Sequence, residues 1–217
     1  MLIDDVSINQ VESTKFLGVH IDQNLTWKVH INQIASKIAK NIGIISRIAY
    51  IILPKTIRMN LYYTLVYPYL TYCNLVWAST YESRLHKLII LQKKAVRIIA
   101  GIRKWEHTGP FFSELHLLKI NQIKDLQICE FFFRLEHGLL PSVFQEYLPH
   151  ASDIHSHFTR NSSAYRPVRA QSNTRRFTVK SYGAQMWNKI PIDIRQSSSL
   201  QVFKKRLRVF LSSTKST

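Results

Sequence analysis

Residues 27–52, WKVHINQIASKIAKNIGIISRIAYII, decide the fold class of this chain because they predict one long amphipathic helix. Isoleucine returns along the stretch at spacings of three and four, the period of one face of an α-helix. Thr26 precedes the pattern as a candidate N-cap, and Pro54 follows it where the helix must end. The face predicted to be buried consists of Ile31, Ile34, Ile38, Ile42, Ile45, Ile48 and Ile52.

Two further helices are predicted downstream. Residues 55–78 are apolar and rich in tyrosine, and Pro68 is expected to break or kink this helix. Tyrosines at such spacing favour packing in the core over a platform on which bases stack. Residues 81–100 repeat the helical spacing, with Gly101 as the expected C-terminal stop. We expect the three helices to pack antiparallel as a bundle. The buried stripe predicted in the third helix is Leu85, Leu88, Ile89, Gln92, Val96 and Ile99.

Shorter elements flank this bundle. Residues 6–21 alternate apolar and polar side chains as paired strands do, with Gly18 in a tight turn. Residues 120–137 keep helical spacing. Residues 150–181 are polar without a lasting period and predict an irregular loop, with at most one short strand near residues 177–179.

The predicted fold class is mainly α: an N-terminal β-hairpin, an antiparallel helical bundle and a smaller helical C-terminal region. The last helix is expected to begin at the cap Ser199 and to expose its four cations, Lys204, Lys205, Arg206 and Arg208. The predicted division is 1–23 for the hairpin, 24–104 for the basic helical bundle, 105–149 for a helical connector, 150–181 for the irregular basic loop and 182–217 for the C-terminal helical segment.

Charge is unevenly distributed along the chain, whose net charge is +17. Residues 23–104 contain 13 Lys and Arg against one acid, Glu82, and residues 160–217 contain 13 against Asp193. The intervening residues 105–159 are acidic overall. Basic surfaces of this density favour a polyanionic partner, because Lys and Arg placed at phosphates release counterions. Nucleic acid is the favoured partner. A solvated basic surface without a ligand, an acidic membrane and an acidic protein are the alternatives.

The candidate nucleic-acid contacts are cations outside the apolar faces of the predicted helices, where a sugar-phosphate strand would lie along them. They are Lys28, Lys37, Lys40, Arg47, Lys93, Lys94, Arg97, Arg103, Lys104, Arg175, Arg176, Lys204, Lys205 and Arg208.

No catalytic or metal-binding constellation is predicted. Asp4 and Asp5 are adjacent, but no third carboxylate is near them in the sequence, and a solvated pair at a strand edge is favoured. His150, His155 and His157 lie in a polar segment without a cluster of cysteines or carboxylates to complete a site. Six glycines in the chain leave no phosphate-binding loop.

Cys73 and Cys129 are too far apart in sequence for a disulfide framework or a zinc finger, and they predict buried free thiols in a reducing compartment. The sequence contains no apolar run long enough for a membrane span, and its first residues lack the basic region of a signal peptide. We therefore expect an intracellular protein without a membrane partner, and nuclear residence fits the charge.

Several separated motifs carry a family resemblance. They are FLGVHIDQNLTW at 16–27, LP at 53–54, LYYTLVYPYLTYCNLVW at 61–77, LHKLIILQKKAVRII at 85–99 and YGAQMWNKIPIDIRQSSSLQVFKKRLRVFL at 182–211. Together they resemble the reverse transcriptases of non-LTR retrotransposons, notably the jockey-like clades. The motifs occur in the family's order and cover nearly the whole chain, so the combination is more specific than any single motif.

The resemblance implies a particular part of such an enzyme. Phe16, Leu17, Gly18 and Val19 are similar to the hairpin that grips the primer end after the palm, and residues 24–104 would form the thumb. The family's catalytic aspartate pair follows an aromatic residue and lies well upstream of this hairpin, so the pair in this chain does not match it. The palm and fingers are expected to be missing, and Mg²⁺ is implied only for that missing palm. We expect no cofactor and no catalytic residue in this chain.

The function implied by the resemblance is that of a truncated RNA-directed DNA polymerase without catalysis of its own. Its implied partners are RNA, RNA–DNA duplex, and the palm and fingers of the same polyprotein. The alternative is a non-catalytic helical module for protein interaction, whose exposed apolar surface would promote self-association.

Overall fold

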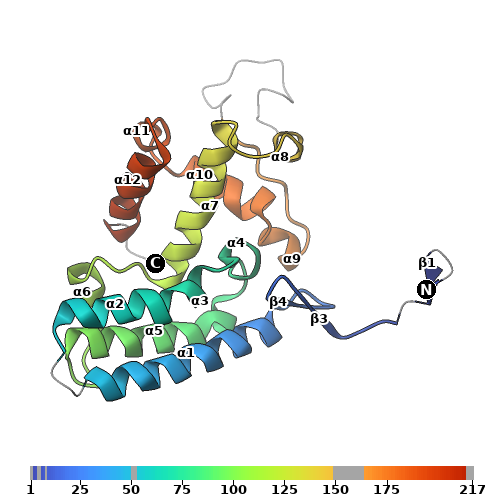
Figure 1. Ribbon diagram of the computed structural model, residues 1–217. Coiled ribbons are helices and arrows are strands. Elements are labelled where there is room, and N and C mark those ends of the chain that lie inside the picture. Colours follow the sequence, from blue (N-terminus) through green and yellow to red (C-terminus); the bar gives the residue numbers. More distant parts are fainter. Residues whose placement is uncertain (1, 4–5, 8, 50–52, 149–163, 214–217) are drawn as a thin grey trace.

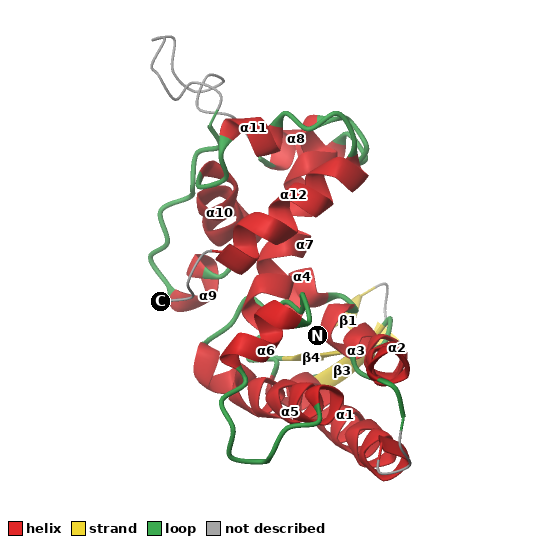
Figure 2. Ribbon diagram, turned by 90° about the vertical axis from the view of Figure 1, so that its left-hand side faces the viewer, coloured by secondary structure: helices red, strands yellow, loops and turns green. Residues whose placement is uncertain are grey.

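The computed structural model describes residues 2–3, 6–7, 9–49, 53–148 and 164–213. This described part is mainly α-helical with small antiparallel strand pairs at its N-terminus, as predicted. Figure 1 shows two tiers. Three long helices form a lower bundle, and the upper tier is built around a further helix that stands across the bundle (Figures 1 and 2).

The hairpin predicted around Gly18 is present. β3 (Ser13–Phe16) pairs antiparallel with β4 (Val19–Asp22). Leu17 and Gly18 connect the strands with φ angles of 45° and 80°, and positive φ at both central residues is what a two-residue type I′ turn requires. The predicted alternation over 6–21 is therefore divided between two strand pairs. The other pair consists of β1 (Leu2–Ile3) and β2 (Val6–Ser7).

The first bundle helix, α1 (Lys28–Ala49), is capped by the end of the hairpin. The Asp22 carboxylate accepts hydrogen bonds from the backbone N–H of Thr26 at 2.8 Å and of Trp27 at 2.7 Å. Burial acts to raise the pKa of Asp22, but these bonds outweigh it and lower the pKa. Thr26, the predicted cap, accepts the Lys28 N–H at a long 3.4 Å and donates to Asp22 at 3.0 Å. Thr26 is therefore a supporting residue, because the stronger acceptor comes from β4.

The isoleucine face of α1 is buried except at its C-terminal end. Ile48 was expected on this face but is 36% exposed. Two successive steps of three residues rotate Ile48 by about 120° from Ile42, which moves it away from the core. Ile52 lies outside the described residues. The buried members are Ile31, Ile34, Ile38, Ile42 and Ile45.

The helix predicted over residues 55–78 is divided into three. Pro68 lies in the first turn of the second piece, so the break falls just before it, as its missing N–H requires. Cys73 has a φ of 48°, which ends that piece in a left-handed conformation and makes a second break that the sequence did not indicate. The pieces are α2 (Lys55–Leu65), α3 (Tyr67–Thr71) and α4 (Asn74–Trp77).

The third bundle helix, α5 (Glu82–Ala100), ends as predicted at Gly101, whose φ is 71°. Successive helices of the bundle are antiparallel, so α1 and α5 run parallel and lie side by side (Figure 1). Asn32 and Lys87, each near the start of its helix, form a hydrogen bond of 2.9 Å across this pair. The predicted antiparallel packing is therefore correct for consecutive helices of the bundle, whereas the α1–α5 pair is parallel.

The upper tier is organised by α7 (Ile120–Glu136), which crosses the bundle and stops before Gly138 as predicted (Figure 2). Its buried face and that of the bundle belong to one contiguous core. The division of the chain into five parts stays a prediction. The other helices around this core are α6 (Gly109–Glu114), α8 (Val143–Tyr147), α9 (Asn173–Arg176), the π-helical turn η2 (Val179–Gly183), α10 (Ala184–Asn188), α11 (Ile192–Arg195) and α12 (Leu200–Ser213).

The irregular loop predicted for residues 150–181 is wrong in part, because its described residues include the helix α9 and the start of the π-helical turn η2, and no strand forms at residues 177–179. Gly183, at the end of that turn, explains why the backbone curls there. A Cβ atom on Gly183 would lie 2.7 Å from the Phe132 ring, so the missing side chain lets the turn pack against α7. Outside the described residues lie His150, His155, His157, Asp4 and Asp5.

Cys129 is a buried free thiol, as predicted, whereas Cys73 is only half-buried. Within the described ranges, no helix is both long and apolar enough to cross a membrane. The same part of the chain holds no group of three or more His, Cys, Asp or Glu side chains that could bind a metal ion.

Candidate nucleic-acid interface

A groove runs between the parallel helices α1 and α5 and has a volume of about 450 Å³. Its α1 wall presents the small side chains of Ala35, Ser36 and Ala39. Its α5 wall presents Ile90 and the cation Lys87. Small side chains allow another surface to approach the helix closely, so this groove combines close access with positive charge at its edge.

The groove leads toward a basic pocket where α2 begins and α5 ends, with a volume of about 540 Å³. Ile90 lines both cavities, and Ser46 of α1 lines the pocket. Between Ala39 and Ser46, Gly43 lies on the same side of α1, and apart from its chain neighbours and the backbone of its own helix, no atom lies within 4 Å of the place where its Cβ would be. The cations of this cavity, called the end pocket below, are Arg58, Lys94, Arg97 and Lys104.

A third cavity, of about 720 Å³, lies at the other end of the bundle, beside the β3–β4 turn. The Tyr72 hydroxyl donates a 2.6 Å hydrogen bond to the Leu17 carbonyl and so ties the turn to the bundle. The Lys37 ammonium lies 5.8 Å from the centre of the Tyr69 ring. A cation next to accessible aromatic rings is a combination that suits single-stranded nucleic acid. This cavity is called the turn pocket below.

The four residues predicted to resemble a primer grip have different environments. Phe16 and Leu17 are 63% and 72% exposed, which is unusual for large apolar side chains. Gly18 lines the turn pocket. Val19 is only 6% exposed and belongs to the core. The turn therefore presents two apolar side chains outward while Val19 anchors it.

His30 attaches the hairpin to α1 in the neutral state. Its side chain is only 4% exposed, and burial, followed by electrostatic interaction with His20 and Lys37, lowers the pKa of His30 to about 4. Nδ1 accepts the His20 backbone N–H at 3.3 Å, and the ring meets Trp77 edge-on at 5.5 Å. His30 is therefore a structural support of the turn pocket and contributes no charge to it near neutral pH.

The bundle and the loop after it carry nine of the predicted contacts, and these face solvent except for the half-buried Arg97. They do not lie on a single face. Lys94, Arg97 and Lys104 meet in the end pocket, and Lys37 lies at the turn pocket. Lys28 is one helical turn before Asn32 and so lies on the groove side of α1. The other exposed cations among these nine line neither pocket; they are Lys40, Arg47, Lys93 and Arg103.

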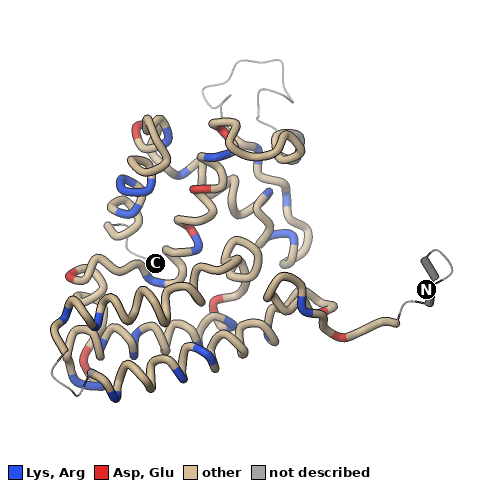
Figure 3. Tube along the Cα trace, in the orientation of Figure 1, with Lys and Arg blue, Asp and Glu red and all other residues tan. Residues whose placement is uncertain are grey.

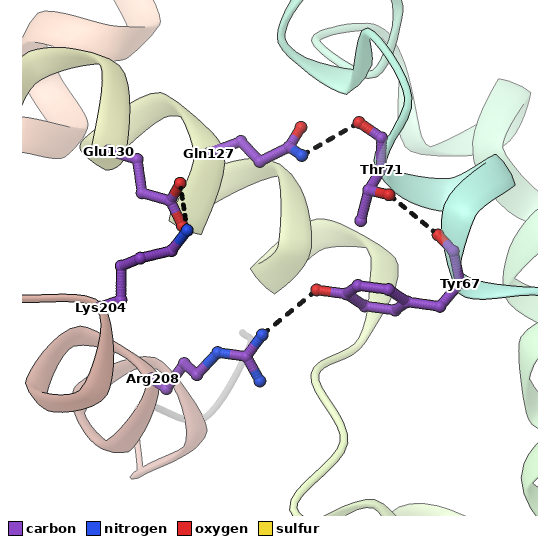
Figure 4. A network of polar contacts seen from close by, with 6 residues as sticks. All are labelled: Tyr67, Thr71, Gln127, Glu130, Lys204 and Arg208. Atoms are coloured by element: carbon purple, nitrogen blue, oxygen red, sulfur yellow. Dashed lines mark hydrogen bonds and ion pairs between the residues drawn. The ribbon is translucent and has the colours of Figure 1, made fainter. Parts of the chain in front are cut away.

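Two predicted contacts on α12 point inward, which corrects the expectation that all its cations face solvent. Lys204 forms an ion pair with Glu130 of α7 at 3.0 Å (Figure 4). Arg208, one turn further along, donates a 3.3 Å hydrogen bond to the Tyr67 hydroxyl of α3 (Figure 4). Residues four apart share a helix side, and here that side faces α7 and α3. These two cations hold α12 in place.

Arg175 and Arg176 are exposed on α9, and Lys205 is exposed on α12. In the Cα trace these helices belong to the upper tier (Figure 3), although Phe177, directly after α9, meets the Tyr81 ring at the start of α5 at 5.0 Å. The structure brings together the cations of the groove and the end pocket, and places those of α12 in the upper tier.

Sequence reasoning missed two cations of this site, Lys87 in the groove and Arg58 in the end pocket. Lys87 could have been found, because Lys87, Ile90, Leu91 and Lys94 share one side of a helix. Arg58 could not, because its position depends on how the start of α2 packs against the end of α5.

The chain is similar to limited parts of two curated proteins. It is 25% identical over 167 residues to the "Probable RNA-directed DNA polymerase from transposon X-element" of Drosophila melanogaster, covering 73% of this chain and 15% of that protein. It is 27% identical over 118 residues to the "RNA-directed DNA polymerase from mobile element jockey" of the same organism, covering 52% of this chain and 13% of that protein. No family model and no solved structure matches the chain. These partial similarities support a relationship to reverse transcriptases.

Proposed function

We propose that this chain is a thumb and C-terminal segment of a non-LTR retrotransposon reverse transcriptase, which binds RNA or RNA–DNA duplex and does not catalyse polymerisation by itself. The observation that carries the proposal is the groove between α1 and α5, where small side chains line one wall and cations mark its edge and its end. We also propose that Mg²⁺ acts only in a palm domain outside these 217 residues, and that the protein resides in the nucleus, which fits its net charge of +17.

The groove suits a nucleic-acid backbone for electrostatic reasons. Within the described residues, no carboxylate forms an ion pair with Lys28, Lys87 or Lys94. Cations of this kind bind phosphates without reading the bases and release condensed counterions as they do so. Binding is therefore expected to be tolerant of sequence and strongly dependent on salt.

Fluorescence anisotropy with a labelled RNA–DNA duplex tests this proposal. If about four phosphates are neutralised, raising the salt from about 50 to about 300 mM lowers the affinity by a factor of roughly 10³. Affinity that stays constant over this range contradicts the proposal. A primer-extension assay with Mg²⁺ and a homopolymer template is expected to give no product, and product formation would contradict the proposed lack of catalysis.

A second candidate function is supported by the apolar residues at the hairpin. Val11, Phe16 and Leu17 are all more than half exposed, which favours contact with another protein surface such as a polymerase palm. On this reading the chain is a protein-interaction module that self-associates when that surface is absent. Light scattering after size exclusion distinguishes the two, because a stable monomer argues against the second candidate.

A further inference from the structure

The end pocket differs from the rest of the basic surface because it is concave and its arginines are held in place. The Arg58 guanidinium donates from Nη1 to the Ile98 carbonyl at 2.9 Å, and Arg97 donates from Nε to the Glu106 carbonyl at 3.1 Å. Each arginine is therefore positioned by one bond to a backbone oxygen and keeps further N–H groups for a ligand.

Arg58 also has an unsatisfied donor. Its Nε atom is buried and has no hydrogen-bond partner among the described residues. Gly101 borders it closely, since a Cβ atom there would lie 3.1 Å from Arg58 Nη1. A glycine at this position keeps the guanidinium accessible. A buried donor without a partner is costly, and an anion in the pocket would bring acceptors next to it.

The electrostatic balance of the pocket favours an anion. Four cations line it, and within the described part of the chain none of them is in an ion pair with a carboxylate. The nearby Glu106 carboxylate is engaged by the Arg103 backbone N–H at 2.9 Å. The C-terminus of α5 contributes roughly half a negative charge, and the N-terminus of α2 offsets it by about the same amount.

An exposed aromatic ring follows the pocket cation Lys104 in the sequence and does not itself line the end pocket. Trp105 follows Lys104 directly and is 75% exposed, whereas Trp27 is half-buried and Trp77 and Trp187 are buried. The Arg103 guanidinium lies 5.7 Å from the centre of the Trp105 ring. Cations that bind a phosphate and a ring that stacks on a base are the two devices by which proteins hold a nucleotide, and here the ring lies beyond the pocket lining, against Arg103.

We infer that the end pocket binds the phosphorylated end of a nucleic-acid strand, with the terminal phosphate among Arg58, Lys94, Arg97 and Lys104 and the terminal base on Trp105. A terminal phosphate monoester carries up to two negative charges near neutral pH, against one for an internal phosphodiester, so four converging cations favour the end. The inference rests on the proposed function for the class of ligand. The end pocket is a site separate from the turn pocket. Ser46 of the end pocket and His30 of the turn pocket are about 24 Å apart along α1 at the usual rise per residue.

The test compares one oligonucleotide in three forms, with a 5′-phosphate, with a 3′-phosphate, or with hydroxyl groups at both ends. Anisotropy at about 150 mM salt, where distant charges are screened, measures the affinity of the full chain for each form. We expect one phosphorylated form to bind about tenfold more tightly than the unphosphorylated form, the effect of one further charge-assisted hydrogen bond. Quenching of Trp105 emission reports the terminal base, and Trp105→Phe removes that signal.

Variants assign the effect to the pocket. Arg58→Gln is expected to abolish the advantage of the phosphorylated end, whereas Lys93→Gln, exposed on α5 outside the pocket, keeps it. Because Arg58 also bonds to the α5 backbone, Lys104→Gln provides a second variant with an exposed side chain, and it is expected to reduce the advantage about threefold.

The outcomes separate this inference from the proposed function. Equal affinity of the three forms, with duplex binding that still weakens as salt rises, overturns the inference and leaves the proposed function in place. An advantage that persists in both Arg58→Gln and Lys104→Gln also overturns it. Absence of any salt-dependent binding to nucleic acid overturns both.

Discussion

Replacing Gln92 with leucine is expected to destabilise the fold by removing the polar junction between the two tiers. Gln92 is 2% exposed. Its amide nitrogen donates to the Tyr62 hydroxyl at 3.0 Å and to the Leu118 carbonyl at 2.9 Å, while its oxygen accepts the Ile120 N–H at 3.0 Å. The side chain thus joins α5 to α2 and to the start of α7.

The magnitude follows from the groups left without a partner. Leucine is close to glutamine in volume, so the cost comes mainly from unsatisfied buried polar groups, each worth about 1–3 kcal/mol. The Ile120 N–H, the Tyr62 hydroxyl and the Leu118 carbonyl lose their partner, and at the lower end of that range this predicts a loss of about 3 kcal/mol in the free energy of unfolding and a drop of roughly 6–12 °C in Tm.

Urea unfolding followed by far-UV circular dichroism measures this loss, with Lys93→Leu on the exposed side of α5 as the control. The double variant Gln92→Leu with Tyr62→Phe is expected to recover about 1 kcal/mol, because it removes the stranded hydroxyl as well. A loss below about 1 kcal/mol for Gln92→Leu would refute the reasoning that this network stabilises the junction.

Three further predictions concern the core and the hairpin. Burial lowers the pKa of His30 to about 4, so the unfolded state binds a proton more readily than the folded state. The free energy of unfolding is therefore expected to fall by on the order of 2 kcal/mol as pH decreases from about 6.5 to about 4. If the urea midpoint of a His30→Gln variant depends on pH in the same way as that of the unchanged protein, this prediction is wrong. Gly183→Ala is expected to cost about 1–3 kcal/mol because its Cβ would meet Phe132, and an unchanged Tm would contradict the packing. Burial raises the pKa of the Cys129 thiol, so a thiol reagent is expected to modify Cys73 alone in the folded protein and both cysteines in denaturant; two reactive thiols in the folded state would be inconsistent with the core.

The features that the sequence predicted correctly depend on local patterns. The isoleucine period located α1, Gly101 marked the end of α5, and the Ser199 hydroxyl accepts the Val202 N–H at 3.3 Å near the start of α12, as a cap does. Period, stop residue and cap are properties of a few neighbouring residues, so they can be recognised without tertiary structure.

The features that it missed depend on partners distant in the chain. Cys73 takes a left-handed conformation that no local residue type indicated. Lys204 was expected to face solvent, but Glu130 on α7 pairs with it across the upper tier. The end pocket requires Arg58 and Lys104 to meet, and only the packing of α2 against α5 brings them together. The helical period therefore identified which cations lie outside the buried faces of the helices, but not which of them meet in one pocket.

The central claim is that the groove between α1 and α5 carries the nucleic-acid contacts. The most direct test measures how steeply the affinity for an RNA–DNA duplex falls with salt, as the slope of log affinity against log salt concentration. The variant carries both Lys28→Gln and Lys87→Gln, which replace two exposed cations on the groove side. Each lost phosphate contact reduces the slope by about 0.9, so a reduction of nearly 2 is predicted, with no change for Lys205→Gln with Arg206→Gln on α12. An unchanged slope in the groove variant, or an equal reduction in the α12 variant, would contradict the claim.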